Sequence, residues 1–182
     1  MTNSLRLRAA RGFTLIELLI VVIIIAILAA IAIPQFSSSS ADAQESALDA
    51  NLATVRSSIE LYRVQHANVY PGVKVSSGGS TCSGTAGTGA VNSKEALSDQ
   101  LTAYSNATGA TCTVTSKDFP FGPYVRAIPN EPLSASNTLT VFNAVLGTPA
   151  TAAVGWAYST VTGQFAANNP GTDSKGKLLA AH

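Results

Sequence analysis

Hydrophobic and polar positions are distributed unevenly along this chain, and the N-terminal part carries most of the imbalance. An apolar stretch runs from Phe13 to Ile33, and from Leu18 onward it contains no polar side chain. Its length suits a membrane-spanning helix, which needs roughly 20 residues, and exceeds the roughly 7–15 residues of the apolar core of a secretory signal peptide. We therefore predict a membrane-spanning segment over residues 13–34.

A second apolar pattern follows and has the period of a helix. Its members recur at intervals of four, three, four and three residues: Leu48, Leu52, Val55, Ile59 and Tyr62. This spacing places them on one face of an amphipathic helix, which we expect to pack as core against a sheet. Between the two patterns, Pro34 and four consecutive serines predict a kink or local melting. The region is therefore either a flexible joint or the start of a second helical half, residues 35–67.

The remaining residues, 68–182, predict a small globular head. Runs rich in β-branched and aromatic residues predict three strands, with a glycine turn between the last two: 138–146, 154–158 and 164–166. A shorter strand is expected within 110–115. Asn92 as cap and Glu95 at the capping-box distance predict a short helix before it. Three strands beside one long helix indicate the α+β class.

The charged residues change this picture at the N-terminus. Charged residues make up 12% of the chain, and the formal net charge of +1 depends on three arginines that precede Gly12: Arg6, Arg8 and Arg11. They indicate a cytoplasmic N-terminal end and a body on the other side of the membrane. Without these three of the eleven basic residues, eight remain against ten acidic ones. No basic cluster is left, so we expect no nucleic-acid partner.

Two cysteines, Cys82 and Cys112, lie in surroundings rich in Gly, Ser and Thr rather than in a CxxC pair. This argues against a metal site or a thioredoxin-like site. If the body is exported, an oxidised pair is its natural state, and loop closure contributes roughly 2–4 kcal/mol. Two unpaired thiols are the alternative. A bond between them would fasten the long loop 75–90 to the head.

One acidic residue, Glu17, lies inside the apolar stretch. A carboxylate in the bilayer is unfavourable and is usually paired or functional, although a position near the interface lets it reach water. Cleavage after Gly12 would create an α-amino group at Phe13, one helical turn from Glu17. That amine, in the same chain or in a neighbouring subunit, supplies the counter-charge that the rest of the segment lacks.

The run Arg11-Gly12-Phe13-Thr14-Leu15-Ile16-Glu17-Leu18 resembles the processing site of type IV prepilins and type II secretion pseudopilins. The following apolar helix and Pro34 fit the same family. The resemblance implies that a prepilin peptidase cuts between Gly12 and Phe13 and N-methylates Phe13, so that residues 1–12 are a leader peptide. It also implies that Glu17 acts in subunit recruitment and methylation.

The same resemblance implies partners, location and fold. An inner-membrane assembly platform with an ATPase extracts subunits from the inner membrane into a helical homopolymer. The precursor lies in the inner membrane with a cytoplasmic leader, and the filament is periplasmic or extracellular. The implied fold is α+β, with a long N-terminal helix whose outer half packs on a small antiparallel sheet.

Short motifs in the head resemble those of major type II secretion pseudopilins: Gly122-Pro123-Tyr124, Pro129-Asn130-Glu131-Pro132-Leu133 and Gly155-Trp156-Ala157-Tyr158. We therefore expect a secretion pseudopilin, with a pilus subunit for adhesion, motility or DNA uptake as the alternative. Major pseudopilins carry calcium in a loop near the C-terminus. Here residues 168–174 offer oxygens but a single carboxylate, Asp173, whereas calcium takes six to eight oxygens. We expect no cofactor, with Asp173 as the one calcium candidate.

No sequence pattern predicts an enzyme. The two histidines, His66 and His182, are far apart in the sequence, and no GxSxG, HExxH, phosphate loop or dinucleotide fingerprint occurs. We therefore expect a structural subunit. The rival from another class is a signal-anchored periplasmic binding domain, in which Gly12–Phe13 would stay uncut and Glu17 would be dispensable.

Overall fold

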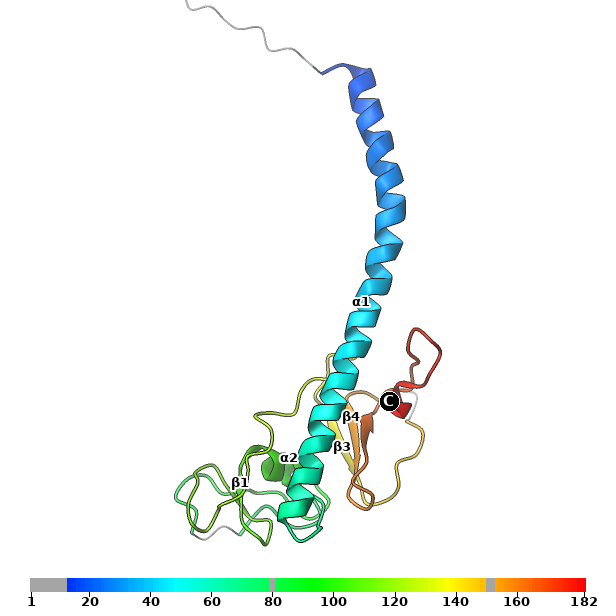
Figure 1. Ribbon diagram of the computed structural model, residues 1–182. Helices are drawn as coiled ribbons and strands as arrows, with labels where there is room; N and C mark the ends of the chain where they lie inside the picture. The colour runs from blue at the N-terminus through cyan, green and yellow to red at the C-terminus, as the bar shows by residue number, and fades with distance from the viewer. Residues whose placement is uncertain (1–12, 79–80, 150–152) are drawn as a thin grey trace, which may run out of the picture. The chain divides into compact units, whose positions relative to one another are not determined.

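The computed structural model describes residues 13–78, 81–149 and 153–182. The predicted leader peptide, Gly12 included, lies outside these residues. The chain divides into two compact units, residues 1–41 and 42–182. One helix, α1 (Leu15–Gln65), contributes to both of them (Figure 1).

In the first unit the described residues are almost entirely helical. The segment Leu15–Ile33 has a mean hydropathy of 3.3 and is long and apolar enough to cross a membrane. Helix α1 continues through Pro34, so the second helical half follows directly from the first. The expected local melting is therefore wrong, while the kink stays a prediction. A proline removes one main-chain hydrogen bond of a helix, and the bonds on either side can persist.

In the second unit the C-terminal part of α1 carries the predicted apolar stripe, and its five members are all at most 1% exposed. They pack with Trp156, Tyr158 and Phe165 in one hydrophobic core. The helix ends at Gln65, earlier than predicted. Asn68 adopts a left-handed conformation (φ 63°), and its N–H donates to the carbonyl of Arg63 at 2.9 Å. This capping turn ends the helix six residues before Pro71.

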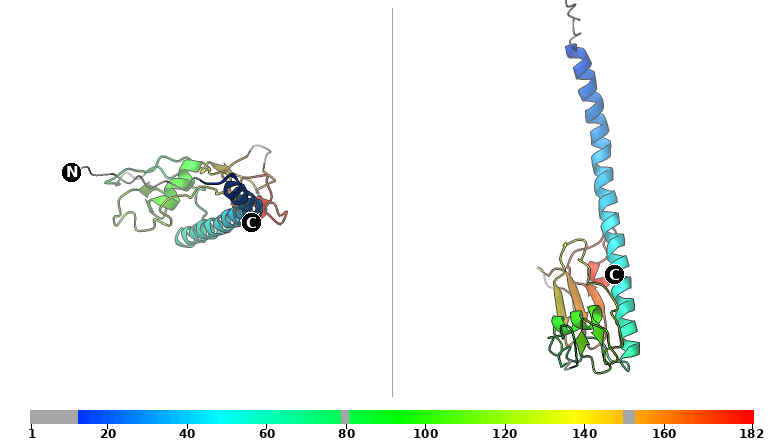
Figure 2. Two further views of the ribbon diagram at one scale, coloured as in Figure 1. Left: turned by 90° about the horizontal axis from the view of Figure 1, so that it is seen from above. Right: turned by 90° about the vertical axis from the view of Figure 1, so that its left-hand side faces the viewer.

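A three-stranded sheet lies next to this part of α1 (Figure 2). Its order is β3 (Leu139–Phe142), β4 (Trp156–Ser159) and β5 (Phe165–Ala167). The predicted hairpin is confirmed, because β4 and β5 are antiparallel. Strands β3 and β4 are parallel, so the sheet is mixed rather than antiparallel throughout. The connection over residues 143–155 permits this, since a parallel pair needs a crossover of about a dozen residues or more.

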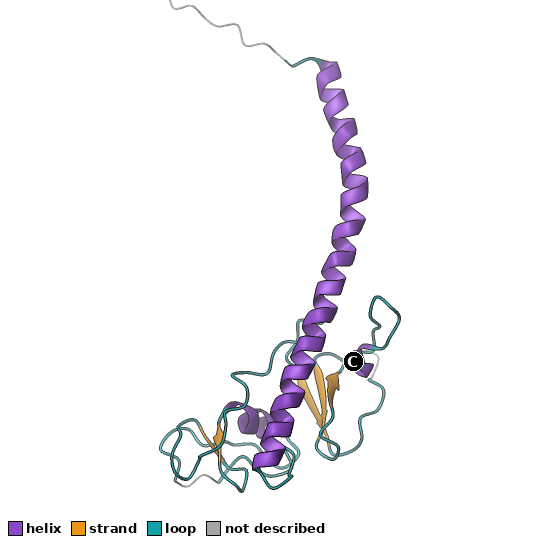
Figure 3. Ribbon diagram, in the orientation of Figure 1, coloured by secondary structure: helices purple, strands orange, loops and turns teal. Residues whose placement is uncertain are grey.

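The rest of the head consists mainly of loops (Figure 3). Helix α2 (Lys94–Thr102) is the predicted short helix. Its N-cap is Ser93, whose side chain accepts a hydrogen bond from the N–H of Ala96. The expected cap, Asn92, instead has a left-handed backbone (φ 57°) and accepts a hydrogen bond from Thr160. After α2 come the short antiparallel strands β1 (Tyr104–Ser105) and β2 (Thr111–Cys112), and the chain closes with the 3-10 helix η1 (Leu179–Ala181).

Candidate functional site

The start of helix α1 is built around two residues, Thr14 and Glu17. The N–H and the hydroxyl of Thr14 donate to Glu17 Oε2 at 2.9 and 2.7 Å, and the N–H of Glu17 donates to Thr14 Oγ1 at 3.2 Å. This reciprocal arrangement is a capping box, in which two side chains satisfy N–H groups that the first helical turn leaves open. The sequence reasoning missed Thr14, although the Thr-x-x-Glu spacing before an apolar run is the usual signal.

The capping box decides where the Glu17 carboxylate lies. It is held in the first turn of α1, at the end of the helix where the backbone dipole favours a negative charge. Phe13 lies two positions before the first residue of α1 and is 78% exposed. An amine created at Phe13 would therefore form four residues before the carboxylate that the family resemblance assigns to assembly, beside the Thr14 that caps it.

The apolar helix behind this site is exposed on all sides. Between Leu18 and Ile33 the large hydrophobic side chains are 47–68% exposed, with no covering partner among the described residues. A helix that is hydrophobic all round needs lipid or other protein around it. The first unit thus carries a surface that requires burial and a carboxylate at its N-terminal end.

The head holds the predicted disulfide, Cys82–Cys112, which joins residues 30 positions apart. Cys112 is 1% exposed and belongs to a small cluster with Ala110 and Phe119, separate from the main core. The bond fastens the loop around Cys82 to strand β2. The alternative of two unpaired thiols does not occur.

Two of the three head motifs that suggested a pseudopilin, those around Pro129 and Trp156, meet at one turn. The indole N–H of Trp156 donates to the carbonyl of Pro129 at 2.7 Å. Glu131 is fully buried, and its carboxylate accepts the N–H groups of Leu133 at 2.9 Å and Ser134 at 2.7 Å, as well as the Ser134 hydroxyl. These contacts give the motif residues a structural role in the fold of the head.

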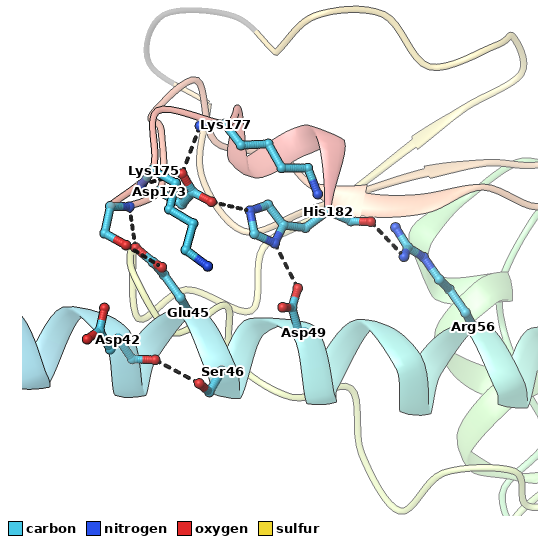
Figure 4. A network of polar contacts seen from close by, with 10 residues as sticks. Asp42, Glu45, Ser46, Asp49, Arg56, Asp173, Lys175, Lys177 and His182 are labelled. Atoms are coloured by element: carbon cyan, nitrogen blue, oxygen red, sulfur yellow. Dashed lines mark hydrogen bonds and ion pairs between the residues drawn. The ribbon is translucent and has the colours of Figure 1, made fainter.

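The candidate calcium ligands near Asp173 accept hydrogen bonds from their own loop. Asp173 Oδ1 accepts the N–H groups of Lys175 and Lys177 (Figure 4), and Asn169 Oδ1 accepts the N–H of Gly171. These two side-chain oxygens thus stabilise the turns of the loop itself. Among the described residues no group of three or more His, Cys, Asp or Glu side chains could hold a metal ion.

One serine–histidine pair lies in the head, between His66 and Ser105. Ser105 Oγ lies 3.1 Å from His66 Nε2, and His66 Nδ1 lies 2.9 Å from the carbonyl of Tyr62. The His66 ring stacks on Tyr62 at 3.7 Å and meets Phe121 edge-on. Both members of the pair are buried, Ser105 completely, so no substrate reaches the hydroxyl. The pair is a packed polar contact rather than a nucleophile with its base.

His66 makes the stability of the head depend on pH. Burial lowers its pKa below the usual histidine value, and this outweighs the opposing hydrogen bonds from main-chain groups of Tyr62 and Asn106. Below about pH 6.5 His66 is therefore protonated in the unfolded chain but remains neutral in the folded chain. The free energy of unfolding should consequently fall as the pH falls through this range. Urea denaturation between about pH 7.5 and pH 5 measures this slope. His66→Phe should flatten it, and an unchanged slope in that variant would contradict the assignment.

Comparison with known proteins agrees with the geometry at the start of α1. A family model described as the prokaryotic N-terminal methylation motif matches residues 7–33. The chain is 50% identical over 56 residues to the type IV narrow pilus major component PilA5 of Thermus thermophilus. The aligned region covers 31% of this chain and 48% of that protein. It is also 54% identical over 50 residues to the type IV major fimbrial protein FimA of Dichelobacter nodosus. This aligned region covers 28% of this chain and 32% of that protein.

These matches span about half or less of the length of the relatives, and no solved structure matches the chain. The family model covers the apolar segment and the residues before it, not the head. The shared N-terminal motif, the apolar helix and the α+β head together define a pilin-like protein. The N-terminal part of the chain is thus similar to that of type IV pilins.

Proposed function

We propose that the chain is a structural subunit of a type IV pilin-like filament. It is made as a membrane-anchored precursor, a prepilin peptidase cuts it between Gly12 and Phe13 and methylates Phe13, and an ATPase-driven inner-membrane platform adds it to a homopolymer. One observation carries the proposal. The carboxylate of Glu17 is held in the first turn of α1, at the start of the exposed apolar segment Leu15–Ile33 and four residues after Phe13, where cleavage would create an amine.

The proposed mechanism is burial with charge compensation. Lipid covers the apolar half of α1 in the precursor, and the same half of neighbouring subunits covers it in the filament. A carboxylate inside such a core needs a partner, because an unpaired buried charge is strongly unfavourable. The amine at Phe13 supplies that partner, so one cleavage both removes the leader and prepares Glu17 for the filament core. The head forms the outer surface, and we propose no catalytic role for it.

Mass spectrometry of the mature N-terminus tests the proposal. Methylated Phe13 is expected as the first residue of protein recovered from sheared filaments. A chain that keeps Met1 in the cell would instead support the signal-anchored binding domain and refute the filament subunit.

The short motifs of the head favour a secretion pseudopilin by resemblance, and the hydrogen bond from Trp156 to Pro129 joins two of them. The names of the relatives favour a pilus subunit, which is therefore the second candidate. Deletion of the gene separates the two. A pseudopilin deletion should leave an exported enzyme trapped in the periplasm, whereas a pilus deletion should remove surface filaments and leave secretion intact.

A further inference from the structure

Strand β3 forms one edge of the three-stranded sheet. Its neighbour β4 uses alternate residues of it, since the N–H of Trp156 donates to the carbonyl of Thr138 at 2.8 Å and Trp156 stands opposite Leu139 in the register. The main-chain groups of Leu139 and Val141 therefore point to the outer side of the sheet. Among the residues that the structure describes they have no hydrogen-bond partner there. Such an edge is a template for pairing with another extended segment.

A groove of about 640 Å³ lies beside the first residues of this edge strand. Helix α2 lies against β3 (Figure 1) and forms one wall of the groove with the side chains of Lys94, Ser98 and Thr102, which are four residues apart. Residues 126–128 and 137–139 complete it. The volume is within the range of roughly 300–1,000 Å³ that ligand sites occupy. The head thus places a helix, a groove and an unpaired strand edge side by side.

The charges in the groove leave one cation without a partner. Lys94 Nζ lies 3.9 Å from Glu95 Oε1. Asp99 Oδ2 accepts the hydroxyl of Ser76 at 2.6 Å and one main-chain N–H at 3.1 Å. Arg126 is exposed, and within the described part of the chain its guanidinium makes no ion pair or hydrogen bond. A guanidinium in this position favours a carboxylate, which it can bind through two parallel N–H bonds.

We propose that the edge of β3 and this groove bind an extended segment of another polypeptide that carries an acidic side chain. The segment adds to the sheet as a further strand, and its main chain pairs with the N–H and C=O groups of Leu139 and Val141. Its carboxylate meets the guanidinium of Arg126. The main-chain hydrogen bonds supply affinity for any extended segment, and Arg126 supplies the preference for an acidic one.

A second copy of this chain is the other possible occupant of the edge. Two β3 edges related by a two-fold axis would pair with each other and close a dimer, whereas a helical filament needs head-to-tail contacts. The choice of a different polypeptide therefore rests on the proposed filament. The site itself rests on the geometry of β3 and α2.

Fluorescence anisotropy of labelled peptides, added to the full chain in detergent micelles, tests this proposal. The probes are short peptides of alternating Thr and Val, with one Glu moved along the series. At least one should bind, and replacing its Glu by Gln should weaken binding about three- to fivefold, as for an exposed ion pair. Absence of binding by every peptide at concentrations up to about 1 mM would overturn the proposal.

Methylated peptides test the strand pairing directly. N-methylation of the peptide nitrogens that face β3 removes their hydrogen bonds and should weaken binding at least about tenfold. The matched control carries the same number of N-methyl groups on the other alternate nitrogens, which face away from β3, and should bind as the unmodified peptide does. Equal binding of the two methylated peptides would show that the edge of β3 is not used, and the proposal would be wrong.

Three variants of the chain complete the test. Arg126→Gln should weaken the Glu peptide about three- to fivefold and leave the Gln peptide unchanged, while Lys117→Gln, an exposed charge outside the groove, should change neither. Val141→Pro removes an outward N–H and spares the ladder with β4, so it should abolish binding. Dimers of the unmodified chain that Val141→Pro abolishes would assign the edge to a second copy and overturn the proposal. The chains are unassembled in this experiment, so its result does not depend on filament formation.

Discussion

Glu17→Ala should abolish filament formation while leaving the precursor in the membrane. The variant keeps the apolar segment Leu15–Ile33, so it still spans the bilayer. It loses the single carboxylate of that segment, and the amine created at Phe13 then has no partner once the helix is buried among other subunits. Filaments recovered by shearing should fall to background, and the amount of protein in the membrane fraction should stay unchanged.

Two further variants separate the charge of Glu17 from its capping hydrogen bonds. Glu17→Gln keeps a side chain that completes the capping box with Thr14 but carries no charge. Thr14→Val removes the hydroxyl and leaves the carboxylate. If the charge matters, Glu17→Gln should be as defective as Glu17→Ala, and Thr14→Val should still assemble, at reduced yield. A normal yield of filaments from Glu17→Gln would show that Glu17 serves the helix cap and would contradict the charge mechanism.

Periodic patterns made much of the fold predictable. The spacing of the apolar residues from Leu48 to Tyr62 predicted the buried face of α1, because side chains three and four residues apart lie on the same face of a helix. The hairpin of β4 and β5 followed from two β-rich runs around a glycine. The disulfide followed from two cysteines in an exported head. Each of these features depends on residues close in sequence or on a small number of alternatives.

Features that depend on distant contacts were not predictable. The direction of β3 relative to β4 depends on how the chain returns through residues 143–155, and no local pattern encodes it. The cap of α2 shifted from Asn92 to Ser93 because Asn92 bonds Thr160, 68 positions away. The contacts of His182 with Asp49 and Asp173 join two distant parts of the chain. Asp173 was a calcium candidate from the sequence, and in the structure its carboxylate accepts hydrogen bonds from the main chain of its own loop.

Breaking the disulfide should destabilise the region around Cys112 more than the main core. The bond closes a 30-residue separation, and the chain-entropy model assigns about 3–4 kcal/mol to a loop of that size. The cluster of Ala110, Cys112 and Phe119 is small and separate from the core on α1, so it has little other apolar burial to hold it. The double variant Cys82→Ala/Cys112→Ala should therefore lose hydrogen-exchange protection around β1 and β2 first, and should keep it longest along the buried stripe of α1.

The matched control for this prediction is Val114→Ala, which changes a side chain that is 45% exposed in the same region and keeps the disulfide. Its free energy of unfolding in urea should differ from that of the unmodified chain by less than about 0.5 kcal/mol, as is usual for surface substitutions. The reduced unmodified chain should behave as the double variant does, because both lack the covalent restriction on the unfolded state. Equal stability of the oxidised and reduced chains would mean that contacts of β2, such as the hydrogen bond from the N–H of Gly87 to the carbonyl of Thr111, hold the loop without the disulfide.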